Sequence, residues 1–455
     1  MHLVGIGGAG MSALARLAVA VGYRVSGTDR DDSATLDALR ALGVDAVAGH
    51  RADAIPADCA TLVVSTAIAP DNPELAEAAR RGIPVVHRAD LLAELMSGRR
   101  GLAVAGAHGK STTSAMLRLA LGGASACIGA TVEGGGGTGA VWGEGPWFVA
   151  EADESDRSLL RLRPEGVILL NVDHDHHSTY ASLDEVEATF AEFLALVPGG
   201  GIVVAGPEPR AHALARACGA PVRIVGDAPD AWCTVGRAPD GAGLLRLADG
   251  REVVLRLAVP GAHNVANAAC AVALADWCGE DPQAAADRLA AFTGVGRRYE
   301  ARGTAGGVTV VDDYAHHPAE VAATLAAARE RHPGRIVAVF QPHLYSRTRA
   351  LWAELGAALG AADIALVTEI YAAREPHDPS ISGRTVADVV PAPTLARFTP
   401  ALADARAAVL EMVRPGDLVL TLGAGDVTTL GQELVAALQN QYGNGDSPGG
   451  AEPPA

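Results

Sequence analysis

The amino-acid sequence predicts an α/β fold of three domains, and three observations support this prediction. Patterns typical of β-strands alternate with patterns typical of α-helices along most of the 455 residues. Two glycine-rich turns each follow a strand and open a helix, and polar clusters follow several apolar strands. Such alternation is typical of parallel sheets covered by helices, and a chain of this length suffices for two to four domains.

The first domain is predicted to be Rossmann-like and to cover residues 1–97. Residues 2–29 show a strand, a glycine turn, a helix and a second strand that ends at Asp29. Gly5, Gly7 and Gly10 fit the pattern G-x-G-x-x-G, in which missing side chains let backbone amides approach a diphosphate, and Asp29 stands where a ribose hydroxyl would be bound. Taken alone, this motif favours NAD, or a tight turn that binds no ligand.

The second domain is predicted over residues 98–295, with a mostly parallel sheet and a P-loop ATPase-like fold. Its first strand leads into "GAHGKSTT", residues 106–113, where Lys110 is the one lysine of the chain. Arginine replaces lysine where a solvated charge suffices, but not where a compact ammonium must fit among phosphate oxygens. The loop therefore predicts ATP, bound by backbone amides and Lys110, with the Ser111 hydroxyl available to Mg²⁺.

Two acidic clusters follow strands of this second domain, "EADESD" at 151–156 and "DHDHH" at 173–177. The carboxyl ends of parallel strands meet at one edge of a sheet, where open α/β folds bind their ligands. Each cluster alone is equally consistent with a solvated loop. Together, beside the phosphate loop, they predict a divalent-metal site with oxygen ligands and a histidine.

The third domain is predicted over residues 296–439 and is again Rossmann-like, because strand and helix patterns alternate there. Its strands end in polar clusters that contain His316, His317, His343, Arg347 and Asp426. Residues 440–455 are rich in Gly, Pro and Asn. This composition predicts a disordered tail.

The composition argues against several classes of partner. A formal charge of −17 opposes binding to nucleic acid and to anionic membranes. No apolar run approaches the length that spans a membrane, and the N-terminus lacks the basic leader of a signal peptide. Six scattered cysteines without CxxC pairs are typical of reduced thiols. We therefore expect a cytoplasmic protein that acts on small molecules, without membrane insertion, as a monomer or a homodimer.

Nine motifs in order resemble those of the Mur ligases of peptidoglycan synthesis, and the resemblance extends to about residue 435. Besides the two glycine turns and the two acidic clusters, the motifs are "GAHNVANA" (261–268), "GVGRRYE" (294–300), "DDYAHHP" (312–318), "QPHLYSRT" (341–348) and "GAGDV" (423–427). The resemblance implies that the first domain binds the UDP part of UDP-N-acetylmuramate rather than NAD. It implies that the central domain binds ATP and that the third domain closes over both and helps to place L-alanine.

The reaction implied by the resemblance forms an amide. The muramoyl carboxylate attacks the γ-phosphate of ATP to give an acyl phosphate and ADP, and the amine of L-alanine then displaces phosphate. Two anions must meet in the first step, so positioning and neutralisation of phosphate charge by Mg²⁺ and Lys110 supply most of the rate.

The resemblance also assigns residues to roles. Those assigned to catalysis are Lys110, His176, Asp313, His343 and Arg347. Those assigned to ATP are Gly106, Ala107, His108, Gly109, Lys110, Ser111, Thr112, Asn264, Asn267 and Arg297. Those assigned to the sugar nucleotide or the amino acid are Gly7, Gly8, Ala9, Gly10, Asp29, Ser65, Thr66, Tyr345 and Arg347. Those assigned to Mg²⁺ are Ser111, Glu151 and His176.

The sequence departs from the family pattern at a few positions. Ala107 and Ser111 stand where threonine is usual, and Asp173 and His174 stand where the family more often has glutamate and a small residue. Ser111 keeps the hydroxyl that a metal requires, while His174 either adds a ligand or packs in the loop. Some relatives hold a second metal with a carbamylated lysine, which this chain lacks; Glu187 is either a carboxylate in that neighbourhood or a solvated helix position.

Two other functions are compatible with parts of the pattern. A metal-dependent hydrolase could use the "DHDHH" cluster to hold zinc or a metal pair, but it would leave Lys110 and the first glycine turn unexplained. A protein that senses ATP and a UDP-sugar without turnover would use the same loops. Acidic clusters after two successive strands predict a metal site, which a protein that only senses nucleotides would not require.

Overall fold

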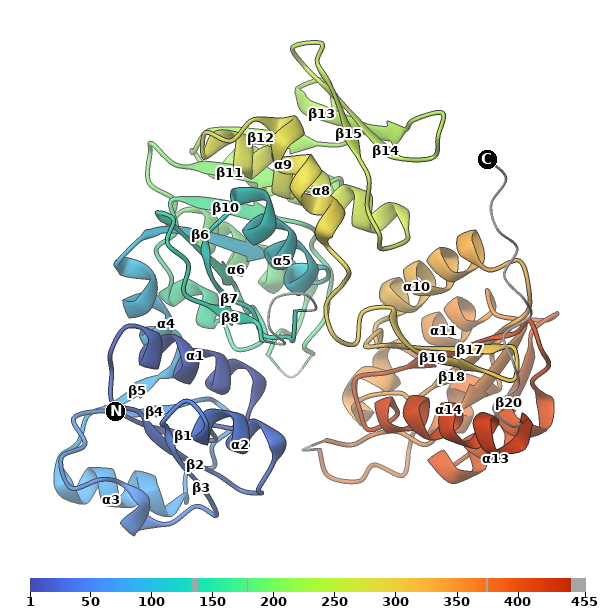
Figure 1. Ribbon diagram of the computed structural model, residues 1–455, viewed down its shortest axis with the longest axis horizontal. Helices are drawn as coiled ribbons and strands as arrows, with labels where there is room; N and C mark the ends of the chain where they lie inside the picture. Colours follow the sequence, from blue (N-terminus) through green and yellow to red (C-terminus); the bar gives the residue numbers. More distant parts are fainter. Residues whose placement is uncertain (133–137, 178, 374, 443–455) are drawn as a thin grey trace. The chain divides into compact units, whose positions relative to one another are not determined.

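The computed structural model describes residues 1–132, 138–177, 179–373 and 375–442 (Figure 1). The chain forms two compact units. The first unit comprises Met1–Ala258 and Asn264–Val295 and contains two sheets, whereas the second comprises Val259–His263 and the residues from Gly296 onward and contains one. The α/β fold with three mostly parallel sheets is confirmed. The domain boundaries at 97/98 and 295/296 stay predictions.

The first sheet is parallel throughout, with the order β3-β2-β1-β4-β5. Its strands are β1 (His2–Val4), β2 (Ser26–Asp29), β3 (Asp45–Ala48), β4 (Leu62–Val64) and β5 (Val85–His87). Its helices are α1 (Ala9–Ala20), α2 (Ala34–Arg40), the short η1 (Ala52–Ala54), α3 (Pro73–Arg81) and α4 (Arg88–Ser97).

The central sheet has ten strands in the order β15-β14-β13-β12-β11-β10-β6-β9-β7-β8, and antiparallel pairs occur at its two ends. The strands are β6 (Arg100–Ala105), β7 (Ser125–Cys127), β8 (Ala140–Val141), β9 (Trp147–Glu151), β10 (Gly166–Leu169), β11 (Ile202–Ala205), β12 (Val222–Val225), β13 (Ala231–Arg237), β14 (Gly243–Leu247) and β15 (Glu252–Leu255). The helices are α5 (Lys110–Leu121), η2 (Ser158–Arg161), α6 (Leu183–Leu194), α7 (Pro209–Ala217), α8 (Ala262–Trp277), α9 (Pro282–Arg288) and η3 (Leu289–Ala291).

The third sheet has the order β16-β17-β21-β18-β19-β20, and only its edge strand β16 is antiparallel to its neighbour. The strands are β16 (Glu300–Ala305), β17 (Val308–Asp313), β18 (Ile336–Phe340), β19 (Ile364–Val367), β20 (Leu395–Phe398) and β21 (Leu418–Leu422). Figure 1 shows α10 and α11 on one face of this sheet and α13 and α14 on the other. The helices are α10 (Pro318–Arg331), α11 (Tyr345–Leu359), α12 (Gly383–Ala387), α13 (Leu402–Met412) and α14 (Thr428–Tyr442).

Local sequence explains where these elements begin. The central strands β6, from Gly101 onward, and β10 are apolar and buried because helices cover both faces of a parallel sheet. Several helices start after a residue whose side chain accepts a hydrogen bond from the first helical turn, as Ser33, Asn72, Ser182 and Asp281 do. α14 continues to Tyr442, so the tail predicted from residue 440 begins with three helical residues. Residues 443–455 of that tail lie outside the described part.

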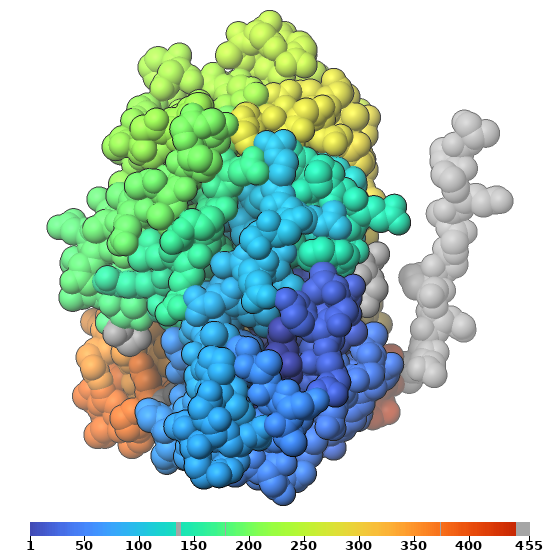
Figure 2. All heavy atoms as spheres, turned by 90° about the vertical axis from the view of Figure 1, so that its left-hand side faces the viewer, coloured from blue at the N-terminus to red at the C-terminus, as the bar shows by residue number. Residues whose placement is uncertain are grey.

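The two sheets of the first unit share one hydrophobic core. A continuous cluster of buried side chains runs from Leu3 and Leu14 of the first sheet region to Phe148 and Phe190 of the central one. Figure 2 shows the two regions, blue and green, in direct contact along their border. The first sheet region is thereby fixed beside the strands that carry the phosphate loop and the acidic clusters. Within the described ranges, no helix is long and apolar enough to cross a membrane.

Candidate active site

The first glycine turn lies between β1 and α1 and is fastened by Asp29. The Gly7 amide donates to Asp29 Oδ2 at 2.8 Å. A Cβ at Gly7 would lie 2.9 Å from both Asp29 Oδ2 and a methyl of Leu36, so any other residue would require these side chains to shift. Asp29, which was predicted to bind a ribose hydroxyl, thus uses one carboxylate oxygen to accept a hydrogen bond from the turn itself. Gly8, Ala9 and Gly10 follow at the start of α1.

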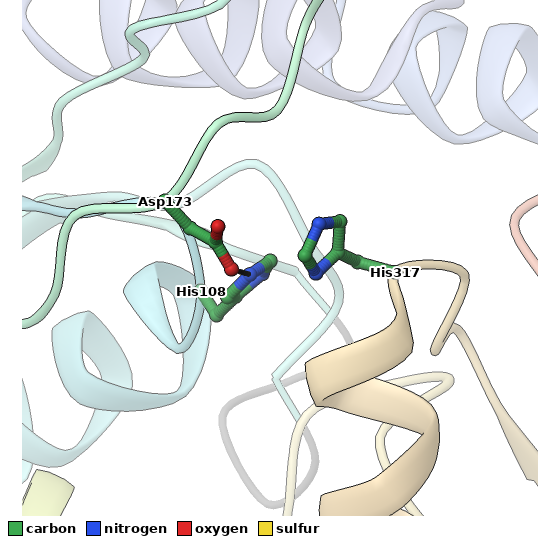
Figure 3. A group of neighbouring side chains, drawn as sticks. All are labelled: His108, Asp173 and His317. Carbon is green, nitrogen blue, oxygen red and sulfur yellow. Dashed lines mark hydrogen bonds and ion pairs between the residues drawn. The ribbon is translucent and has the colours of Figure 1, made fainter. Parts of the chain in front are cut away.

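The phosphate loop joins β6 to α5 and is held by Asn171, which follows β10. Asn171 Oδ1 accepts from the His108 amide at 2.9 Å, and its Nδ2 donates to the His108 carbonyl at 3.0 Å. Gly106 and Gly109 have φ values of 134° and 84°, which side chains rarely permit. Figure 3 shows His108 facing Asp173, with His108 Nε2 and Asp173 Oδ2 at 3.3 Å; His317, also drawn there, precedes α10 in the second unit. The role of Asn171 was missed from the sequence, although this residue stands two positions before the first residue of the "DHDHH" cluster.

Lys110 is the first residue of α5 and is bound by its own loop and by one carboxylate. Its Nζ donates to the carbonyls of Gly106 and Ala107 at 2.7 and 3.0 Å, and to Glu154 Oε1 at 2.9 Å. Burial alone would lower the pKa of Lys110, but Glu154, with Asp153 and Glu151 further away, raises it above the ordinary value. The side chain is therefore a fixed cation at the start of the helix.

Ser111 and Glu151, two of the residues predicted to hold Mg²⁺, lie next to each other. Ser111 Oγ donates to Glu151 Oε1 at 2.9 Å, and Glu151 Oε2 accepts from the Gly129 amide at 2.8 Å. Nearby in the same acidic loop, the buried Glu154 Oε2 has no hydrogen-bond partner within the described ranges. Hydroxyl and carboxylate oxygens are the ligands that Mg²⁺ prefers, so this donor set fits the ion.

The loop after β10, which contains the "DHDHH" cluster, places His176 beside Glu154. His176 Nε2 lies 3.3 Å from Glu154 Oε1, and the residue has a φ of 56°. His174 instead packs in the loop, with Nε2 3.1 Å from the Tyr180 carbonyl and its ring 4.3 Å from that of His177. Glu187 of α6 pairs with Arg210 of α7, with oxygen and nitrogen 3.1 Å apart.

Three more predicted groups border the loops of the first unit. The amide of Asn267, on α8, reaches the phosphate loop, since a Cβ at Gly109 would lie 3.1 Å from Asn267 Oδ1. Asn264 and Thr112 are buried at the starts of α8 and α5. Ser65 and Thr66 follow β4, and Thr66 Oγ1 donates to Asp156 Oδ2 of the acidic loop at 3.3 Å.

In the second unit, the two neighbouring arginines of "GVGRRYE" have different partners. Arg297 Nη2 donates to the carbonyls of Gly423 and Gly425 at 2.6 and 3.2 Å, so the arginine predicted to bind ATP holds the loop after β21. Arg298, which was not predicted, pairs instead with Glu320 at 3.2 Å, while both guanidinium groups lie over the Tyr314 ring. The sequence offered no signal that would distinguish the two.

Asp313, at the end of β17, is a buried carboxyl fixed by two backbone amides. It accepts from the Tyr299 amide at 2.7 Å and from the Ala315 amide at 2.8 Å. Burial raises its pKa to about 6, although the nearby Arg298 and these amides oppose the shift. A carboxyl with such a pKa changes charge near neutral pH.

The remaining predicted residues surround the start of α11. Arg347 Nη1 lies 3.0 Å from His343 Nδ1, and the His343 ring is stacked on that of Tyr371 at 5.9 Å. Tyr345 hydroxyl lies 2.9 Å from His377 Nδ1. Leu344 between them has a φ of 68°, a strained conformation for a side chain of this size.

A phosphate loop with one lysine, a hydroxyl–carboxylate pair and a second glycine turn fit the class of ATP-dependent ligases. Three family models match the chain. They are described as Mur ligase family, catalytic domain (residues 1–100), Mur ligase middle domain (144–275) and Mur ligase, glutamate ligase domain (297–425). The chain belongs to the Mur ligase family.

The relatives narrow the comparison to one kind of Mur ligase. The UDP-N-acetylmuramate--L-alanine ligase of Kineococcus radiotolerans is 49% identical, with 96% of each chain covered. That of Streptomyces coelicolor is 46% identical, covering 96% of this chain and 97% of its own. Among solved structures, the UDP-N-acetylmuramate-alanine ligase of Thermotoga maritima is 27% identical, with a TM-score of 0.80 over 97% of this chain and 99% of its own.

Proposed function

We propose that this chain is an ATP-dependent amide ligase that joins L-alanine to the carboxylate of UDP-N-acetylmuramate in peptidoglycan synthesis, releasing ADP and phosphate. The observation that carries the proposal is the identity of 49% and 46% to ligases of this name over nearly the whole length. The carboxylate of the sugar nucleotide attacks the γ-phosphate, and the amine of alanine attacks the resulting acyl phosphate. The amide bond forms as phosphate leaves.

The roles proposed for the residues in the first unit rest on their chemistry and on their positions in the motifs of the family. The phosphate-loop amides and Lys110 bind the ATP phosphates, and Asn264 and Asn267 of α8 contact the nucleoside. Ser111, Glu151 and His176 are the proposed holders of Mg²⁺, which when bound neutralises phosphate charge. The first glycine turn, with Ser65 and Thr66, binds the sugar nucleotide.

The second unit supplies the groups proposed for the amino acid. Asp313, His343, Tyr345 and Arg347 are the proposed residues, with Arg347 as a fixed cation for a carboxylate. Arg297 supports them by holding the loop that contains Gly423 and Gly425. We also propose a cytoplasmic location, which is supported by the free state of all six cysteines, and a monomeric or homodimeric enzyme.

One assay separates this function from its alternatives. Phosphate release from ATP is measured with both substrates, with each alone and with neither. The ligase releases phosphate only when UDP-N-acetylmuramate and L-alanine are both present. Release without them would indicate the metal-dependent hydrolase, and binding without release would indicate the nucleotide sensor.

A further inference from the structure

Arg88 connects the first glycine turn to the acidic loop of the central sheet. It is the first residue of α4, and its Nη2 donates to Asp153 Oδ2 at 2.7 Å and to Asp156 Oδ2 at 3.3 Å. Its other terminal nitrogen, Nη1, borders the first glycine turn, since a Cβ at Gly10 would lie 3.9 Å from it. One guanidinium thus borders both loops.

The donors of Arg88 are unevenly used. A guanidinium has five N–H groups in a rigid fork. Within the described ranges, all hydrogen bonds of Arg88 come from Nη2. Their acceptors are Asp153, Asp156 and, at 3.5 Å, Ser158 Oγ. The donors on Nη1, beside the glycine turn, remain for a ligand.

The surroundings keep this arginine in place and charged. Its side chain is 20% exposed. Burial alone would lower the pKa of Arg88, but Asp153 and Asp156 raise it. An arginine held by carboxylates on one side presents its other nitrogen in a fixed direction, which is how arginines recognise carboxylate and phosphate oxygens.

We propose that Arg88 is a binding residue for the sugar-nucleotide substrate, and that its Nη1 donates to an anionic oxygen of that substrate at the glycine turn. This inference rests on the proposed function. Its partner Asp153 belongs to the loop whose next residue, Glu154, binds Lys110. Arg88 therefore ties the position of the sugar nucleotide to the loop that contacts the lysine of the phosphate loop.

The test measures binding of each substrate separately by calorimetry on the full chain. For Arg88→Ala we expect the Kd of UDP-N-acetylmuramate to rise on the order of tenfold to a hundredfold, as for loss of a hydrogen bond to a charged group. The Kd of a non-hydrolysable ATP analogue should change less than about threefold, because the phosphate loop is untouched. UDP-N-acetylglucosamine, which has the diphosphate but no carboxylate, identifies the oxygen. If Arg88→Ala weakens binding of UDP-N-acetylglucosamine to a similar extent, Nη1 donates to the diphosphate. If the affinity for this ligand is unchanged, Nη1 donates to the carboxylate.

Two further variants keep the test decisive. Arg161→Ala removes an exposed ion pair to Asp90 of the same helix, at 2.7 Å, and should leave both affinities unchanged. Arg88→Lys keeps the charge but cannot hold Asp153 and a ligand in one rigid geometry. We therefore expect its affinity for UDP-N-acetylmuramate to fall several-fold at an unchanged melting temperature. This variant decides the test if Arg88→Ala does not fold. An unchanged Kd, or an equal loss for the ATP analogue, would overturn the inference. Wild-type protein that does not bind UDP-N-acetylmuramate would instead refute the proposed function.

Discussion

Lys110 and Glu154 form a buried ion pair, with Nζ 2.9 Å from Oε1, and the Glu154 side chain is 3% exposed. The same carboxylate oxygen lies 3.3 Å from His176 Nε2. Glu154 therefore supplies the counter-charge of the lysine when phosphates are absent. Binding of ATP must exchange this carboxylate for phosphate oxygens, so the two partners compete for one ammonium.

This competition gives the first prediction, for Glu154→Gln. Removing one charge from a buried pair leaves the other uncompensated and typically costs about 3–5 kcal/mol, so we expect a lower melting temperature for the variant without ligand. Phosphates can restore the missing charge, so an ATP analogue with Mg²⁺ should raise the melting temperature of the variant more than that of the wild type. A smaller rise in the variant would show that Glu154 serves ATP binding directly rather than competing with it.

The second prediction concerns Lys110→Arg. The planar guanidinium is wider than an ammonium and cannot take the same place among the carbonyls of Gly106 and Ala107. Losing such a clamp typically costs on the order of 3–4 kcal/mol of transition-state stabilisation, so turnover should fall roughly a hundred- to a thousandfold.

The matched control for that exchange is Arg210→Lys, at a half-exposed position on α7. It makes the reverse substitution away from the loop and should leave turnover unchanged. Arg210→Lys should retain the wild-type melting temperature within a few degrees. Lys110→Arg keeps a positive charge opposite Glu154 and should therefore lower the melting temperature less than Glu154→Gln does. Near-normal turnover of Lys110→Arg would show that the single lysine is an accident of composition.

The third prediction concerns Asn171, whose hydrogen bonds hold the phosphate loop in place. Asn171→Ala removes two hydrogen bonds to His108, each contributing about 1 kcal/mol. We expect kcat/KM for ATP to fall roughly thirtyfold. Gln283→Ala is the control, because Gln283 bonds the amide and carbonyl of Val254 in the same way, at 2.9 and 3.2 Å. If both variants lost ATP efficiency equally, the effect would be one of general stability.

The fourth prediction is a pH dependence from Asp313. Its folded pKa of about 6 exceeds the ordinary 3.8, so the folded state binds the proton more tightly. The stabilising contribution is complete below the unfolded pKa and is lost as pH rises through about 6. Asn resembles the protonated carboxyl, so the stability of Asp313→Asn relative to wild type should increase between pH 5 and pH 8 by about 1.5 kcal/mol.

Urea unfolding at the two pH values measures this difference. The exposed Asp404, on α13 of the same unit, provides the control variant Asp404→Asn, for which no comparable change is expected. A difference between wild type and Asp313→Asn that stays constant with pH would contradict the raised pKa.

The sequence predicted the sheets and loops because these depend on local patterns. Strand β9 ends at Glu151, the first residue of the predicted acidic cluster, and the helix after the phosphate loop begins at Lys110. The pairing of Ser111 with Glu151 was predictable because parallel strands end at one edge. The bond from Asp29 to Gly7 and the role of Asn171 were not, because they depend on side-chain directions across neighbouring strands. Arg297 and Arg298 are adjacent in sequence, and only the fold decides which one binds the loop at Gly423.

The central claim is that the muramoyl carboxylate is activated by phosphoryl transfer from ATP. The most direct measurement uses UDP-N-acetylmuramate labelled with ¹⁸O in that carboxylate, together with ATP, Mg²⁺ and L-alanine, and analyses the inorganic phosphate by mass spectrometry. Attack of the carboxylate on the γ-phosphate and displacement by the amine carry one labelled oxygen into each phosphate released. Phosphate with one ¹⁸O per amide formed is the expected result. Unlabelled phosphate accompanying the amide product would contradict the acyl-phosphate reaction.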